Sequence, residues 1–78
     1  MTEKEELLFL IDKFISGSDT SRESVQKIEG LMIDLYLDSD VFEEASEALS
    51  LYRPGAGLPY MDEKDMSGVL AEVRDRIS

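Results

Sequence analysis

The sequence predicts an all-α protein, a compact four-helix bundle that forms a single helical domain over residues 1–78. Four segments carry apolar residues at the three- and four-residue spacing of an amphipathic helix, and none alternates apolar and polar residues as a strand does. Each segment begins close to a serine, threonine or aspartate, the residues that cap helix starts. Brief connections would then let the four apolar faces bury one another.

The first helix is expected over residues 3–16. Thr2 and Glu5 have the spacing of a capping box, in which each side chain accepts a hydrogen bond from the backbone N–H of the other residue. Gly17 follows the apolar segment and favours the left-handed conformation that ends many helices. The residues expected to face the core are Leu7, Leu10, Ile11, Phe14 and Ile15.

The second helix is expected to begin within the stretch "SDTSRES" and to run to about Leu37. Thr20 lies three residues before Glu23, which indicates a second capping pair. Gly30 lies inside this helix, where glycine costs about 1 kcal/mol relative to alanine, so it indicates a close contact with a neighbouring helix. The apolar stripe consists of Val25, Ile28, Met32, Leu35 and Tyr36.

The third and fourth helices are separated by the loop "RPGAGLPYM". Asp40 and Glu43 form a capping pair at the start of the third helix, and Pro54 ends it near Arg53. Asp62 begins the fourth helix, whose first turn carries further acids where the helix dipole favours them. The expected core residues are Val41, Phe42, Ala45, Ala48, Leu49 and Tyr52, then Met66, Val69, Leu70, Val73 and Ile77.

The charge balance points to a cationic partner. The 18 acidic and 8 basic residues give a net charge of −10, which repels nucleic acid and anionic membranes and speeds encounter with a basic protein. Because cysteine and histidine are both missing, we expect no enzymatic activity, no metal and no cofactor. No apolar run is long enough to span a bilayer and no secretory leader is recognisable, which favours a cytoplasmic protein.

The acids are concentrated in the middle of the sequence, since no basic residue occurs between Lys27 and Arg53. Glu43 and Glu47 lie four residues apart on the face opposite the apolar residues of the third helix, where like charges cost a few tenths of a kcal/mol. A stripe of one sign is therefore more typical of a docking surface than of a face built for stability. The predicted partner-binding residues are Asp38, Asp40, Glu43, Glu44, Glu47, Tyr60, Asp62 and Glu63.

Ser39, between two aspartates, permits chemical interpretations as well. The size, the acidity and the Asp-Ser pair before a helix are similar to acyl carrier proteins, in which such a serine carries a phosphopantetheine arm, although Asp40 stands where that family has leucine. A calcium-binding loop that begins at Asp38 is excluded, because its sixth position would be Glu43 instead of glycine and its twelfth Leu49 instead of glutamate. The simplest alternative is that Ser39 lies in the turn where the third helix starts.

Three stretches resemble, in order, the bacterial immunity proteins of the colicin D type and of contact-dependent growth inhibition systems: "LLFLIDKFISGSDTSRES", "LMIDLYLDSDVFEEASEALSLYRP" and "YMDEKDMSGVLAEVRDRI". The resemblance implies a four-helix protein that binds, one to one, a toxin's basic nuclease domain that cleaves transfer RNA. Such relatives carry acids after the third helix, where this chain has residues 53–57, so we expect the contact to rest on the acids of residues 38–47 and 62–63. An adaptor for another basic protein is the alternative that remains open.

Overall fold

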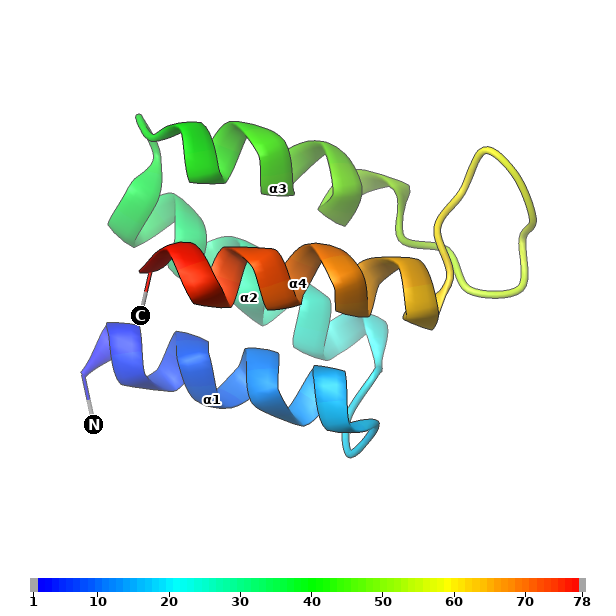
Figure 1. Ribbon diagram of the computed structural model, residues 1–78, viewed down its shortest axis with the longest axis horizontal. Coiled ribbons are helices and arrows are strands. Elements are labelled where there is room, and N and C mark those ends of the chain that lie inside the picture. Colours follow the sequence, from blue (N-terminus) through cyan, green and yellow to red (C-terminus); the bar gives the residue numbers. More distant parts are fainter. Residues whose placement is uncertain (1, 78) are drawn as a thin grey trace.

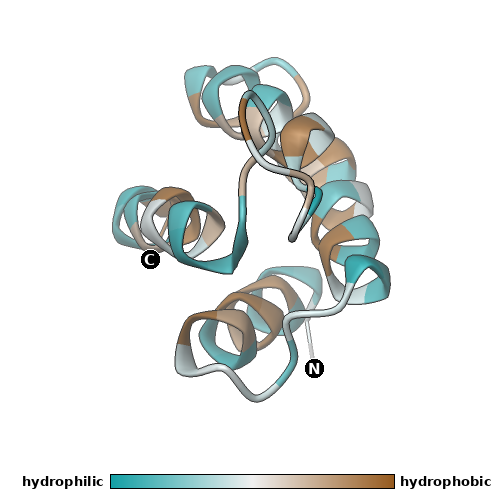
Figure 2. Ribbon diagram, turned by 90° about the vertical axis from the view of Figure 1, so that its right-hand side faces the viewer, coloured by the Kyte–Doolittle hydropathy of each residue, from teal (hydrophilic) through white to brown (hydrophobic). Residues whose placement is uncertain are grey.

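The structure is a computed structural model that describes residues 2–77 and confirms the all-α four-helix bundle (Figure 1). Its helices are α1 (Glu3–Ser16), α2 (Arg22–Tyr36), α3 (Asp40–Leu51) and α4 (Glu63–Ile77). Helix α1 packs against α2 and α4, and α3 packs against the same two helices. In the end-on view of Figure 2 the four helices surround a common centre, toward which their apolar residues mainly face.

Short polar side chains begin all four helices. The capping box of α1 is confirmed: the Thr2 Oγ1 accepts from the Glu5 N–H at 3.1 Å, and Glu5 accepts in return from the Thr2 N–H. The Asp62 carboxylate accepts from the Asp65 N–H at 3.0 Å at the start of α4, as predicted. Gly17 ends α1 with a φ of 85°, a conformation that glycine adopts without the steric cost of a Cβ.

The predicted caps of α2 and α3 are each wrong by one residue. Ser21, rather than Thr20, caps α2 by accepting from the Ser24 N–H at 3.1 Å, because the Asp19 carboxylate accepts from both the N–H and the hydroxyl of Ser21 and fixes it there. These hydrogen bonds lower the pKa of Asp19 below its ordinary value. Ser39, rather than Asp40, caps α3, so the expected Asp40–Glu43 pair does not form the cap.

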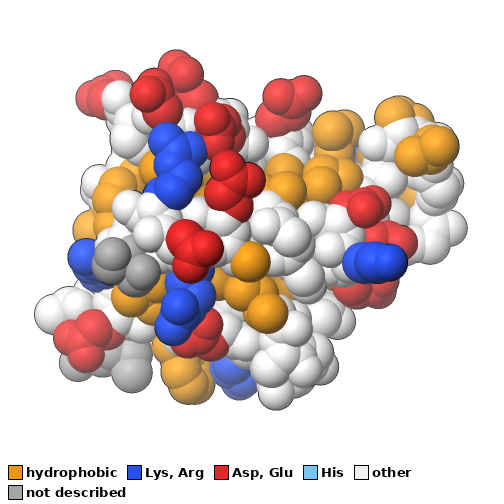
Figure 3. All heavy atoms as spheres, viewed as in Figure 1, with side chains coloured by type: hydrophobic (Ala, Val, Ile, Leu, Met, Phe, Trp, Pro, Cys, Tyr) orange, Lys and Arg blue, Asp and Glu red, His pale blue; other side chains and the backbone are white. Residues whose placement is uncertain are grey.

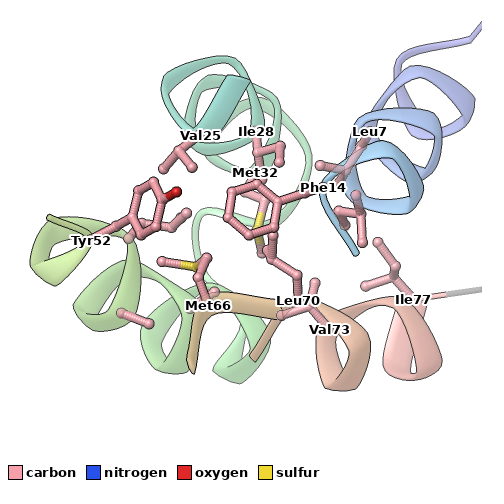
Figure 4. Packing of buried hydrophobic residues seen from close by; sticks show 14 residues of the cluster. Leu7, Phe14, Val25, Ile28, Met32, Tyr52, Met66, Leu70, Val73 and Ile77 are labelled. Atoms are coloured by element: carbon pink, nitrogen blue, oxygen red, sulfur yellow. The ribbon is translucent and has the colours of Figure 1, made fainter. Parts of the chain in front are cut away.

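Residues of all four helices form the hydrophobic core (Figure 4). Two residues of the expected stripes, Ile15 and Leu35, are instead 39% and 37% exposed. Each is next in sequence to a residue that takes the core-facing position instead, Phe14 beside Ile15 and Tyr36 beside Leu35. The buried apolar residues are Leu7, Ile11, Phe14, Val25, Ile28, Met32, Ala45, Ala48, Leu49, Tyr52, Met66, Leu70, Val73 and Ile77, with Leu10, Tyr36, Val41, Phe42 and Val69 partly buried against them.

Tyr52 ties the end of α3 to the connection between α1 and α2. Its ring meets the Phe14 ring edge to face, with the centroids 5.4 Å apart, and its hydroxyl donates to the Thr20 carbonyl at 2.6 Å. Burial of the phenol, together with the negative charge of Glu63, raises the pKa of Tyr52 above its ordinary value of 10.0. The folded protein therefore binds this proton more tightly than the unfolded chain.

The Tyr52 proton gives a testable dependence of stability on pH. The stability that comes from it is complete below about pH 10, the unfolded pKa, and is lost as the pH rises through the higher folded pKa. We expect the free energy of unfolding to fall above pH 10 more steeply for the native chain than for Tyr52→Phe, which should itself cost about 1 kcal/mol at pH 7. Urea unfolding from pH 7 to 11 would check this.

The predicted close contact at Gly30 is wrong, because a Cβ built on this residue would meet no heavy atom within 4 Å. The same is true of Gly68 in α4. We therefore expect Gly30→Ala and Gly68→Ala each to raise the free energy of unfolding by about 0.5–1 kcal/mol, since alanine loses less backbone entropy in a helix. Gly17→Ala, at positive φ, should instead lower it by about 1 kcal/mol. Urea midpoints of the three variants would test this ranking, and a destabilised Gly30→Ala would contradict it.

The loop after α3 projects from one end of the bundle (Figure 1). Its two ends are joined by backbone hydrogen bonds, from the Arg53 N–H to the Met61 carbonyl at 3.0 Å and from the Met61 N–H to the Leu51 carbonyl at 2.8 Å. Leu58 near its tip is 94% exposed. The loop is thus fixed at its base, beside the start of α4.

Candidate partner-binding surface

Helix α3 presents a row of carboxylates to solvent. Its apolar residues Ala45, Ala48 and Leu49 are buried against the bundle, so helical periodicity turns the acids of the same helix outward. All of these acids are exposed, and Asp38 extends the row into the turn before α3. We call this set the α3 acidic surface; it comprises Asp38, Asp40, Glu43, Glu44 and Glu47.

Little of the α3 acidic surface is neutralised within the chain. Among the described residues only Glu44 has an ionic partner there, the Arg76 guanidinium of α4 at 2.5 Å. The other arginine of the last turn of α4, Arg74, instead pairs with Asp12 of α1. Figure 3 shows acidic side chains gathered over α3, with few basic ones among them. The surface therefore keeps a strong negative potential that a cationic partner would neutralise.

Ser39, which lies between Asp38 and Asp40, is the N-cap of α3. Its hydroxyl oxygen accepts from the Phe42 N–H at 3.2 Å and donates to the Tyr36 carbonyl at 2.7 Å, so the side chain is held between α2 and α3. Such a cap stabilises a helix by about 1 kcal/mol. This local role accounts for serine at the position. The carrier hypothesis stays a prediction, and an added phosphopantetheine in the intact mass of protein from its own host would support it.

The remaining predicted site residues form a second group at the other end of α3. Tyr60 lies in the loop, Asp62 caps α4 and Glu63 is in its first turn. The Arg53 guanidinium lies 5.0 Å from the centre of the Tyr60 ring, so one face of that ring is already covered by a cation. Since the 12 residues of α3 rise by about 18 Å, this group and Asp38 are a helix length apart.

Two neighbouring hollows lie beside α3 and share Glu44, and we call them together the groove. One part, of about 210 Å³, is lined by Glu44, Glu47, Ala48, Leu51 and Met61. The next part, of about 100 Å³, is lined by Glu44, Ala45, Val69, Glu72, Val73 and Arg76. In Figure 3 apolar side chains are visible between the acids of α3 and those at the start of α4. The structure thus adds an apolar strip to the acids that the sequence indicates.

Sequence reasoning missed this strip, although a signal for it exists. Glu44, Glu47 and Leu51 follow one another at the three- and four-residue spacing that places them on one face of a helix. Their pairing with Met61 depends on how the loop returns to the bundle, which is a tertiary contact. No pattern of neighbouring residues in the sequence predicts the path by which the loop returns to the bundle.

Other kinds of site find no support in the described part of the chain. Across residues 2–77 no three acidic side chains come together as a group that would hold a metal ion. None of the four described helices has the length and apolar character required to cross a bilayer. No family model, curated protein or solved structure matches this chain. The fold and the surface define a small acidic all-α protein.

Proposed function

We propose that this chain is an immunity protein of the cytoplasm, which binds and neutralises a basic, tRNA-cleaving nuclease toxin in a one-to-one complex. It performs no reaction itself. The observation that carries the proposal is the α3 acidic surface, in which several exposed carboxylates of one sign follow one another with a single ionic partner among the described residues. Such a surface is unfavourable for the isolated helix and becomes favourable when a cationic surface covers it.

Inhibition follows from the resemblance between this surface and the backbone of a nucleic acid. A nuclease that cleaves RNA needs basic side chains along the path of the phosphates. The carboxylates of α3 form a row of negative charges on a rigid helix, which can occupy that path without offering a bond to cleave. Because the helix is packed on the core before binding, little ordering entropy is lost on association.

The proposal predicts that a toxin gene lies next to the gene of this protein, and the nuclease domain of that toxin is the partner to test. Titration calorimetry should give a one-to-one complex, and a gel assay should show transfer RNA left intact once the two proteins are equimolar. The association rate should fall as salt rises from 50 mM to 500 mM, because screening shortens the reach of the charges. Cleavage that continues in the presence of excess protein would contradict the proposal, as would the lack of a complex at low salt.

A further inference from the structure

The part of the groove that Leu51 and Met61 line has a shape and chemistry of its own. It is lined by three apolar residues, Ala48, Leu51 and Met61, which we call its floor, and by two glutamates of α3, Glu44 and Glu47, which we call its rim. We infer that it receives the side chain of one arginine or lysine of the basic partner, with the aliphatic stem on the floor and the charge between Glu44 and Glu47. The inference rests on the proposed function, to which it adds the anchor point of the complex.

The floor is preformed. The Met61 N–H donates to the Leu51 carbonyl at 2.8 Å, which holds these two floor residues side by side. Met61 also packs against the buried core, so the loop cannot withdraw it without loss of core contacts. Leu51 is only partly buried, and it is not among the apolar side chains that pack on the core of the described chain. Its apolar surface thus remains available to a partner.

The rim selects the charge of the occupant. Glu44 is held in place by Arg76, whereas Glu47 has no ionic partner among residues 2–77. An uncharged apolar side chain would displace water from these carboxylates without offering a hydrogen bond or a charge in its place, which costs free energy. An acidic side chain would be repelled. A cation with an apolar stem satisfies floor and rim together, as lysine and arginine do when they lie along apolar surface. Arginine would in addition offer a fork of N–H donors to the two carboxylates.

The size of this part of the groove agrees with a single side chain. Its volume of about 210 Å³ lies below the range of about 300–1,000 Å³ that is typical of pockets for drug-sized ligands. Its position between the α3 acidic surface and the start of α4 places it near the middle of the predicted contact residues. Residues that dominate binding usually lie in such central pockets, surrounded by polar contacts that exclude water.

The first experiment uses small probes and does not depend on the toxin. Amide NMR spectra are recorded during titration with butylguanidinium, which imitates an arginine side chain, with guanidinium ion, which lacks the stem, and with butanol, which lacks the charge. We expect butylguanidinium alone to give saturable shifts centred on Glu47, Leu51 and Met61, and Leu51→Ser to weaken them at least about threefold. Equal effects of guanidinium and butylguanidinium, or shifts spread over all acids, would overturn the inference.

The second experiment measures binding to the toxin nuclease domain described above. Leu51→Ser should raise the Kd by about tenfold or more, and Glu47→Gln should do the same, because both remove part of a central contact. Leu58→Ser, which changes an exposed leucine outside this groove, is the matched control and should leave the Kd unchanged. Circular dichroism would verify that each variant is folded.

The two experiments separate the failure of the inference from that of the proposed function. If the native chain binds the toxin and both groove variants bind equally well, the groove is not the anchor and the immunity function stands. If the native chain does not bind the toxin at all, the proposed function fails, and the anchor inference that rests on it falls as well. In that case the butylguanidinium titration would still report whether the groove takes a cationic side chain.

Discussion

Replacing Phe14 by alanine should remove a large part of the protein's free energy of unfolding. Phe14 is 0% exposed and lies at the centre of the core, edge to face with Tyr52. Removal of a buried phenylalanine ring costs about 3–5 kcal/mol, since apolar burial is lost and a cavity remains. A chain of 78 residues has a total stability of about 4–12 kcal/mol, so this single change removes much of it. Urea unfolding followed by far-UV circular dichroism would measure the loss.

Phe9→Ala provides the matched control on the same helix. Phe9 is 51% exposed, and its ring is covered only in part, by the Lys13 ammonium at 5.4 Å from the centroid. Its loss should cost no more than about 1 kcal/mol. Comparable urea midpoints for the two variants would show that the core does not depend on Phe14.

The helices could be predicted from the sequence because each carries its own apolar period and its own cap. Phe14, Ile28 and Leu70, for example, are buried as their spacing indicates. The caps are harder to predict. The stretch "SDTSRES" before α2 offers several hydroxyl residues close together, and only the structure shows which of them accepts from a free backbone N–H. The choice of Ser21 follows from its two hydrogen bonds with Asp19, a detail of turn geometry rather than of composition.

The candidate site was predictable only in part, for a related reason. Exposure of Glu43 and Glu47 follows from the helical period of α3. The partners of Glu44 and of Leu51 come from α4 and from the returning loop, and depend on which helices become neighbours. The same tertiary arrangement determines which arginines are engaged, because Arg74 and Arg76 reach across to α1 and α3. Local patterns therefore identify the acids but not the groove between them.

The largest expected effect on binding comes from reversing the charges of Glu43 and Glu47. Both side chains are exposed, lie outside the core and have no ionic partner among residues 2–77, so the fold should tolerate lysine at both positions. In the proposed complex, however, each new lysine would face a basic surface of the toxin partner, so that a repulsion would replace an attraction. We expect Glu43→Lys/Glu47→Lys to raise the Kd for the toxin domain by about 100-fold or more and to slow association.

The control variant must change the net charge by the same amount as Glu43→Lys/Glu47→Lys and leave the residues of α3 unchanged. Glu6→Lys/Asp75→Lys does so, since both residues are exposed and lie on α1 and α4. If binding depended only on the net charge of −10, the two double variants would lose affinity alike. If the α3 acidic surface is the site, the control should bind nearly as the native chain does, with only a modest change in association rate at low salt. Equal losses of affinity in the two double variants would show that the attraction comes from the net charge of the whole protein. An unchanged Kd for Glu43→Lys/Glu47→Lys would show that the α3 acidic surface does not contact the partner.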